Sequence, residues 1–264
     1  MPFTTANDIS IYFEVCGEGP PLFLVCGLGQ NHLSWGELVP ILSEHFQVIQ
    51  FDNRGVGQTE APNEGYSIKM MAQDISAFMG SIGIESAHFM GESMGAAIIL
   101  QLCIDHPDRV QKAVLSAPFA HFPETKKNTV RTQLKLLKDG IEFRRLVELN
   151  ISWLLSNHFL SFPKNIEAYL NMMGSNPYPQ THEGRLGQAD ALLEFDIRKD
   201  LSKIPHELLL LIGEHDLAIP PFISREISKN TLNCSTHTFK EVGHLITYEV
   251  PEKSAKQAIT FLTG

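Results

Sequence analysis

Ser93 has the sequence surroundings of a nucleophile. It lies at the centre of Gly-Glu-Ser-Met-Gly (91–95), between an apolar run typical of a strand and a run, 95–106, typical of a helix. This pattern predicts a sharp strand-to-helix turn with the hydroxyl at its apex. A serine hydroxyl attacks a carbonyl only when a neighbouring base takes its proton and a third group orients that base. The five residues alone also fit a small side chain in a tight turn. A catalytic role for Ser93 therefore depends on whether the sequence also supplies a base and an orienting acid.

Two later residues have the types and places that these roles need. Asp216 follows the apolar run 208–213, and His244 follows the next strand-like run. Because the carboxyl ends of parallel strands meet at one edge of a sheet, we expect Ser93, Asp216 and His244 to converge. Taken singly, Asp216 also fits a helix cap and His244 a surface loop. Three matches at three strand ends favour a catalytic triad.

A third strand end could supply hydrogen-bond donors for an oxyanion. Gly27-Leu28-Gly29 follows the apolar run 22–26, and small residues there let the backbone N–H of Leu28 point into the site beside that of Met94. A plain glycine-rich connection predicts the same glycines. The sequence therefore indicates an oxyanion hole here less specifically than it indicates the nucleophile.

The elements that must position these residues alternate in type. Short apolar runs separated by helix-like stretches fill residues 9–117 and return from 206 onward, which is typical of a parallel sheet covered on both faces. Residues from about 120 to 190 contain no convincing strand. We predict an α/β core domain of residues 1–119 and 190–264, and a helical insertion, 120–189, between two strands of its mostly parallel sheet.

Composition excludes several function classes. The 264 residues carry a net charge of -9, which argues against a nucleic-acid partner. The glycines at 55 and 57 lack the third glycine of a dinucleotide-binding loop, and the 11 histidines form no H-E-x-x-H or similar cluster. We therefore predict no cofactor and no metal.

The cysteines and the N-terminal segment bear on the compartment. Cys16, Cys26, Cys103 and Cys234 are far apart in the chain, which favours reduced thiols. Residues 1–15 lack the basic and apolar regions of a signal peptide, and no apolar run approaches the roughly 18 residues of a membrane span. We predict a cytoplasmic protein without a membrane span.

Together these motifs resemble the α/β-hydrolase fold superfamily over nearly the whole chain. The segments that carry the resemblance are the nucleophile turn, the strand-end glycines, FDNRGVGQT (51–59), GEHDLAIP (213–220) and GHLITYEVPE (243–252). The resemblance implies Ser93 as nucleophile, Asp216 as acid and His244 as base. It also implies that 51–59 is a structural turn beside the site, where we expect Asp52 and Arg54 to form a paired charge.

The chain departs from the family pattern at two positions. Members commonly have His-Gly at the oxyanion strand and often His before the nucleophile, whereas this chain has Cys26 and Glu92. We expect Cys26 to be a buried small hydrophobic residue rather than a second nucleophile. We expect Glu92 to be a solvated or loop-bonded carboxylate, the alternative being a buried acid that changes pKa values in the site.

The resemblance further implies that the insertion is a cap that supplies the substrate pocket. Phe122, Trp153 and Phe159 are the foremost candidates for its lining, although such residues also fit the core of the cap. The remaining candidates are Phe162, Tyr169, Met172 and Met173.

A basic strip accompanies the first helix predicted in the insertion. Apolar residues recur at 130, 134, 137 and 141, and Lys127, Arg131, Lys135 and Lys138 follow the adjacent flank. The strip is either a solvated helix face or a site for an anionic group, such as a substrate carboxylate or an acidic carrier protein.

The sequence thus favours a serine hydrolase that acts on a small carboxylic ester, lactone or thioester. His244 would deprotonate Ser93, Asp216 would hold the imidazole, and Leu28 and Met94 would donate to the oxyanion. In its overall form the chain resembles two groups of this superfamily: enol-lactonases, and carboxylesterases that act on carrier-bound methyl esters. Two alternatives remain open: a ligand-sensing receptor of the same fold with slow turnover, and carbon-carbon bond hydrolysis or lyase chemistry on the same triad.

Overall fold

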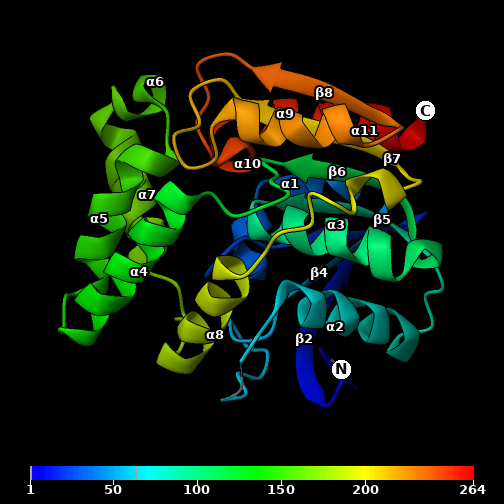
Figure 1. Ribbon diagram of the computed structural model, residues 1–264, viewed down its shortest axis with the longest axis horizontal. Helices are drawn as coiled ribbons and strands as arrows, with labels where there is room; N and C mark the ends of the chain where they lie inside the picture. Colours follow the sequence, from blue (N-terminus) through cyan, green and yellow to red (C-terminus); the bar gives the residue numbers. More distant parts are fainter. Residues whose placement is uncertain (1, 64) are drawn as a thin grey trace.

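A mostly parallel sheet of eight strands forms the centre of the computed structural model, which describes residues 2–63 and 65–264 (Figure 1). Residues 1 and 64, both within the predicted core domain, lie outside the described part. The sheet order is β1-β2-β4-β3-β5-β6-β7-β8, and only the β1–β2 and β2–β4 pairs are antiparallel. The strands are β1 (Phe3–Ala6), β2 (Ile9–Cys16), β3 (Pro21–Val25), β4 (Gln47–Phe51), β5 (Ala87–Glu92), β6 (Val110–Ser116), β7 (Glu207–Gly213) and β8 (Cys234–Phe239). This confirms the predicted fold class.

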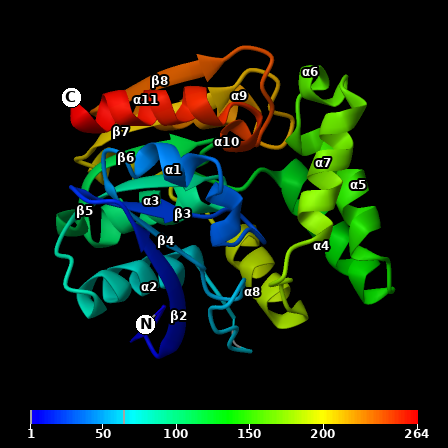
Figure 2. The ribbon, with the colours of Figure 1, turned by 180° about the vertical axis from the view of Figure 1, so that it is seen from behind.

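Helices cover both faces of the sheet, which explains why its inner strands are continuously apolar. On one face lie α2 (Ile68–Ser81), α3 (Met94–Asp105) and α9 (Pro221–Asn230), and their apolar residues join one core cluster. On the other face, seen from the front in Figure 2, α1 (Leu38–Leu42) and α11 (Pro251–Thr263) pack on each other over a second cluster. Every residue of α3 from 94 to 103 is buried, because α2 and the sheet enclose it.

Five α-helices occupy the chain between β6 and β7: α4 (Glu124–Lys138), α5 (Phe143–Leu154), α6 (Asn157–Leu160), α7 (Pro163–Gly174) and α8 (His182–Leu193). We call residues 124–193 the cap. Figure 1 shows α4 to α7 as a separate layer beyond one end of the sheet, with α8 lying between that layer and the core. The predicted boundary between residues 189 and 190 falls inside α8.

Two backbone hydrogen bonds join the ends of this insertion. Phe122 N donates to Phe195 O at 3.2 Å, and Ile197 N donates to Ala120 O at 2.8 Å, so the chain leaves and re-enters the core at neighbouring points. The sequence pattern indicates α8 less clearly than α4 and α5. The polar, proline-containing stretch 174–184 is typical of a loop, and it ends within the first turn of α8.

In residues 2–63 and 65–264, no helix is long and apolar enough to cross a lipid bilayer. The same residues contain no group of three His, Cys, Asp or Glu side chains that could hold a metal ion.

Candidate active site

Ser93 occupies a strained turn between β5 and α3. Its φ and ψ are 55° and -113°, a conformation that non-glycine residues rarely adopt. The turn is held because Ser93 N donates to Ser116 O at 2.8 Å, and because α3 approaches β3 so closely that a Cβ on Gly95 would collide with the carbonyl oxygen of Val25. The predicted strand-turn-helix geometry is therefore present, with the hydroxyl at its apex.

His244 lies between Ser93 and Asp216. Its Nε2 is 3.0 Å from Ser93 Oγ, and its Nδ1 is 2.8 Å from Asp216 Oδ2. The other oxygen of Asp216 accepts hydrogen bonds of 2.8 Å from the backbone N–H groups of Ala218 and Ile219. These bonds fix the carboxylate, so the proton of the neutral imidazole belongs on Nδ1 and Nε2 is left to accept from the serine.

The pKa of His244 is the result of opposing effects. Burial would lower it, but the charge and the hydrogen bond of Asp216, with a further contribution from Glu92, outweigh burial and raise the pKa above its ordinary value. Lys126 acts in the opposite direction and lowers it. A raised pKa makes the imidazole a stronger base, which suits proton removal from a hydroxyl.

The loop after β3 holds the other expected donor. Gly27 N donates to Gln30 Oε1 and Gly29 N to Gln188 Oε1, both at 2.9 Å, whereas no acceptor within residues 2–63 and 65–264 takes the N–H of Leu28. Met94 is the first residue of α3, so its N–H has no partner within the helix. Both amides thus have the hydrogen-bonding state that an oxyanion hole needs, and the assignment remains a proposal.

Glu92 is buried beside the nucleophile. It is 3% exposed and accepts a hydrogen bond of 2.8 Å from Thr247 Oγ1, with weaker contacts of 3.4 Å from Gln30 Nε2 and Ser116 Oγ. Burial raises the pKa of its carboxyl group, and these hydrogen bonds oppose the rise. The expectation of a solvated or loop-bonded carboxylate is wrong, because Glu92 is buried under Thr247 and Gln30 and bonds chiefly to Thr247. The alternative is confirmed: Glu92 is a buried acid, and it helps to raise the pKa of His244.

The other departure from the family pattern, at Cys26, is structural. Cys26 is fully buried, as predicted, and its Sγ accepts a 3.1 Å hydrogen bond from Trp35 Nε1.

The expected pairing of Asp52 with Arg54 is wrong. The Arg54 guanidinium instead forms a buried salt bridge with Asp74 on α2, and Asp52 contacts His32 Nδ1 at 2.8 Å. Sequence distance hid these partners, since both lie about 20 residues away along the chain.

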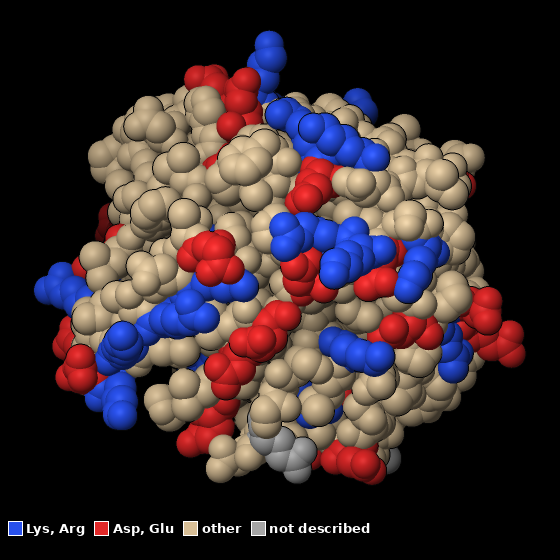
Figure 3. All heavy atoms as spheres, in the orientation of Figure 1, with Lys and Arg blue, Asp and Glu red and all other residues tan. Residues whose placement is uncertain are grey.

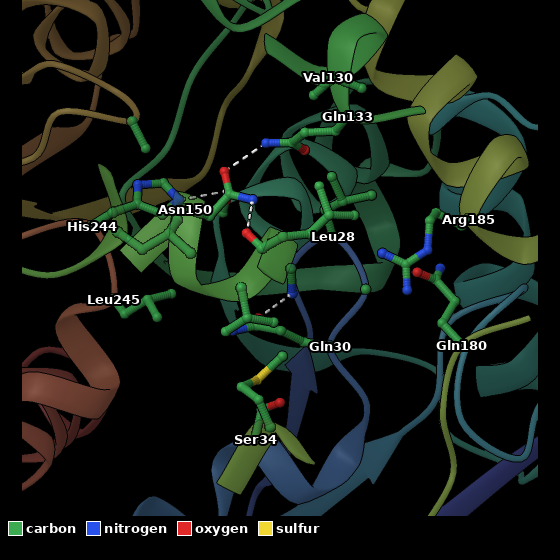
Figure 4. A pocket seen from close by; sticks show the side chains of 18 of the residues that line it. Leu28, Gln30, Ser34, Val130, Gln133, Asn150, Gln180, Arg185, His244 and Leu245 are labelled. Atoms are coloured by element: carbon green, nitrogen blue, oxygen red, sulfur yellow. Dashed lines mark hydrogen bonds between the residues drawn. The ribbon is translucent and has the colours of Figure 1, made fainter. Parts of the chain in front are cut away.

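A pocket of about 260 Å³ opens over Ser93 and His244, and cap residues form most of its wall. Figure 4 shows His244 and Leu245 on one side of it, with Val130 and Gln133 of α4 above. Its apolar lining includes Phe122, which lies just before the cap, and the cap residues Val130, Leu134, Leu137, Leu146, Val147, Tyr169, Met172, Met173 and Leu192. An apolar wall with a few polar groups is typical of small-molecule sites.

Two of the three foremost pocket candidates were placed wrongly. Phe122 lines the pocket, but Trp153 and Phe159 do not. Trp153, on α5, is 45% exposed, and Lys126 Nζ lies 4.4 Å from its ring centroid. Phe159 packs on Tyr248 in a cluster between the cap and the core. The direction in which each cap helix faces depends on its packing partners, which the sequence pattern alone does not identify.

The basic strip of α4 also lies away from the pocket. Arg131, Lys135 and Lys138 are exposed, Lys127 forms a 2.9 Å salt bridge with Glu124, and none of the four lines the cavity. Figure 3 shows basic side chains on the outer surface over the cap, at the left of the view. The strip therefore fits the solvated helix face and lies away from a substrate carboxylate held in the pocket, and its binding of an acidic carrier protein stays a prediction.

The cations that do line the pocket were missed by the sequence analysis. They are Lys126, at the start of α4, and Arg185, on α8. A signal for Lys126 existed, since it lies four residues before Val130 and so continues the apolar stripe of α4. No comparable signal marked Arg185, because the stretch before it read as a loop.

Comparison with known proteins agrees with this fold. A family model for the alpha/beta hydrolase fold matches residues 20–251. The chain belongs to the α/β-hydrolase family. Among curated relatives, this α/β hydrolase is 29% identical over 270 residues to a protein of Caulobacter sp. (strain K31) with the provisional name carbamate hydrolase RutD, and the match covers 96% of each chain.

Two solved structures have the same fold as this α/β hydrolase. One is the enol-lactonase of Burkholderia xenovorans LB400, with 24% identity, a TM-score of 0.88 and 100% of each chain covered. The other is a thermophilic esterase of Thermogutta terrifontis, with 23% identity, a TM-score of 0.86 and coverage of 100% of this chain and 97% of that one. At such identities the likeness shows a common fold.

Proposed function

We propose that this α/β hydrolase is a cofactor-independent serine hydrolase that cleaves a small carboxylic ester, lactone or thioester. The observation that carries the proposal is the contact of His244 with both Ser93 Oγ, at 3.0 Å, and Asp216 Oδ2, at 2.8 Å, at the floor of an apolar pocket. A nucleophile, a base and an orienting acid in this order are the groups that acyl transfer needs.

The reaction begins when His244 Nε2 takes the Ser93 proton as Oγ adds to the substrate carbonyl. The backbone N–H groups of Leu28 and Met94 donate to the oxyanion, and the protonated imidazole, stabilised by Asp216, gives its proton to the leaving group. The acyl-enzyme then reacts with a water molecule that His244 deprotonates. Addition of this water to the acyl carbonyl gives a second oxyanion, and its collapse releases the acid and restores Ser93.

The pocket favours a substrate with a substantial apolar part. About 260 Å³ lined by aliphatic and aromatic cap residues accommodates an acyl chain or ring beside the reacting carbonyl. The provisional name of the Caulobacter relative adds carbamates to the classes worth testing, since their carbonyl accepts the same attack. The fold alone does not choose among these classes.

The test is a pre-steady-state time course with p-nitrophenyl acetate and butyrate. We expect rapid acylation followed by turnover in the wild type, and loss of both in Ser93→Ala by several powers of ten. Ser34→Ala, which removes another hydroxyl lining the same pocket, is the matched control and should retain both phases. An active Ser93→Ala enzyme would refute the mechanism, and acylation without turnover would favour the ligand-sensing alternative.

A further inference from the structure

The pocket wall opposite His244 carries two polar residues that the proposed triad does not use. Figure 4 shows Arg185 and Gln180 on the side opposite His244 and Leu245, with both side chains directed towards the cavity. The two residues are held close together, because Gln180 Nε2 donates to Gly55 O at 3.1 Å while Gly184, the residue before Arg185, packs against the same carbonyl group.

The orientation of the Gln180 amide is fixed by its partners. Its Nε2 donates to two acceptors, Gly55 O at 3.1 Å and Gln188 Oε1 at 3.0 Å. A flipped amide would bring its oxygen against both of these oxygens, so the flip is excluded. Gln188 is itself fully buried and locked, since its Nε2 donates to Arg54 O at 2.9 Å and its Oε1 also accepts from Gly29 N at 2.9 Å.

This network leaves one acceptor without a donor. Gln180 Oε1 is buried, and no group in residues 2–63 and 65–264 donates a hydrogen bond to it. Buried polar atoms without a partner are rare in folded proteins. The oxygen has almost no exposed surface, so a molecule in the cavity does not reach it, and the fixed amide serves to hold Gln180 in the pocket wall.

Arg185 supplies a positive charge beside Gln180 in the pocket wall. Its guanidinium carbon lies 4.8 Å from the centroid of the Phe143 ring, which orients the group, and no carboxylate of the described residues comes within 4.0 Å of it. Burial lowers the pKa of Arg185, but a guanidinium stays charged at any physiological pH. A partly buried cation without a carboxylate partner binds an anion more strongly than a solvated one does.

We propose that Arg185, beside the fixed Gln180, forms a subsite for a carboxylate, so that the preferred substrates are esters or lactones whose acyl part ends in such an acid. The guanidinium donates to the carboxylate oxygens. The inference rests on the proposed hydrolase function, and it assigns the end of the acyl part that is remote from Ser93.

The kinetic test compares methyl valerate with monomethyl glutarate, whose acyl chains have the same length, by titration of the released acid. In the wild type we expect KM for the glutarate ester to be lower by roughly tenfold or more, as a charged hydrogen bond predicts. Arg185→Gln should abolish this ratio of KM values. Arg131→Gln, which removes an exposed cation of the same cap, should preserve it. A ratio near one in the wild type, or a ratio unchanged in Arg185→Gln, overturns the proposal.

A binding test separates the subsite from the chemistry. Calorimetry with glutarate needs no turnover, and we expect glutarate to bind to the wild type and to lose affinity in Arg185→Gln. If no ester is hydrolysed but this pattern is found, the subsite stands and the hydrolase proposal fails. Equal binding by wild type and Arg185→Gln overturns the subsite.

Discussion

Thr247 Oγ1 donates a 2.8 Å hydrogen bond to Glu92 Oε1. Glu92 is the last residue of β5, directly before Ser93, and Thr247 lies in α10 (Ile246–Glu249), three residues after His244. The bond therefore joins the segment that positions the nucleophile to the segment that positions the base. It also holds a buried carboxylate where its charge contributes to the raised pKa of His244.

Glu92→Gln should shift the acidic limb of the pH profile of kcat/KM to lower pH. Activity requires neutral His244 and is lost as pH falls through the pKa of the imidazole, and Glu92 is one of the groups that raise this pKa. The glutamine oxygen can still accept from Thr247, so the fold is retained. An unchanged limb would show that the Glu92 carboxyl is already neutral in the free enzyme, as strong burial could make it.

Lys126→Met should shift the same limb to higher pH. Lys126 lines the pocket, and its positive charge lowers the pKa of His244, so its removal raises that pKa. Burial lowers the pKa of Lys126 itself to about 8, so its influence on the site fades above that pH. Lys127→Met, one position along α4 and outside the pocket lining, is the control. A shift in the same direction for Lys126→Met and Glu92→Gln would contradict the electrostatic argument.

Asp216→Asn should lower kcat by roughly 10⁴-fold, in line with amide replacements of the acid in serine triads. The asparagine oxygen can keep the hydrogen bonds from Ala218 N and Ile219 N, which leaves its NH₂ group facing His244 Nδ1 and forces the wrong tautomer. Steady-state kinetics measure the loss, and an unchanged urea midpoint shows that the fold is intact. A loss of less than tenfold would remove Asp216 from the proposed triad.

Gly95→Ala should destabilise the protein by about 1–3 kcal/mol or more, because the added Cβ collides with the carbonyl group of Val25 and forces α3 away from β3. Urea unfolding measures the change. Gly174→Ala is the matched control, since a Cβ there meets no atom within 4 Å and alanine favours the helix. Similar stabilities for both variants would show that the close approach of α3 to β3 is dispensable.

Glu249→Ala should lower both stability and kcat. The carboxylate accepts from Ser156 N at 2.8 Å, from Ser156 Oγ at 2.6 Å and from Gly243 N at 3.0 Å, so it links the cap to the residue before His244. Each buried donor left without a partner costs about 1–3 kcal/mol. Glu85→Ala, at an exposed loop residue, should change neither quantity. A stable but fully active Glu249→Ala enzyme would show that this link does not position His244.

Local sequence patterns were sufficient for the frame of the fold and for the candidate catalytic residues. The run before Ser93 is apolar because β5 is buried on both faces, and the glycines around it are needed where α3 approaches β3. Asp216 and His244 follow their strands closely, so recognising the strand ends places the side chains at one edge of the sheet. For these strand ends and the turn at Ser93, residues near in sequence were sufficient for the prediction.

The pocket depends on contacts that no local pattern specifies. Helical periodicity marks an apolar face on α4 and α5, but whether that face covers the cavity or the cap core depends on how the helices pack, and Trp153 was therefore misplaced. Arg185 and Gln180 reach the pocket because Gly184 and Gln188 pack against the turn at Arg54 and Gly55, about 130 residues earlier. The sequence by itself determined the fold and indicated the chemical groups, whereas the tertiary structure decided which side chains face the substrate, because that choice is made by long-range packing.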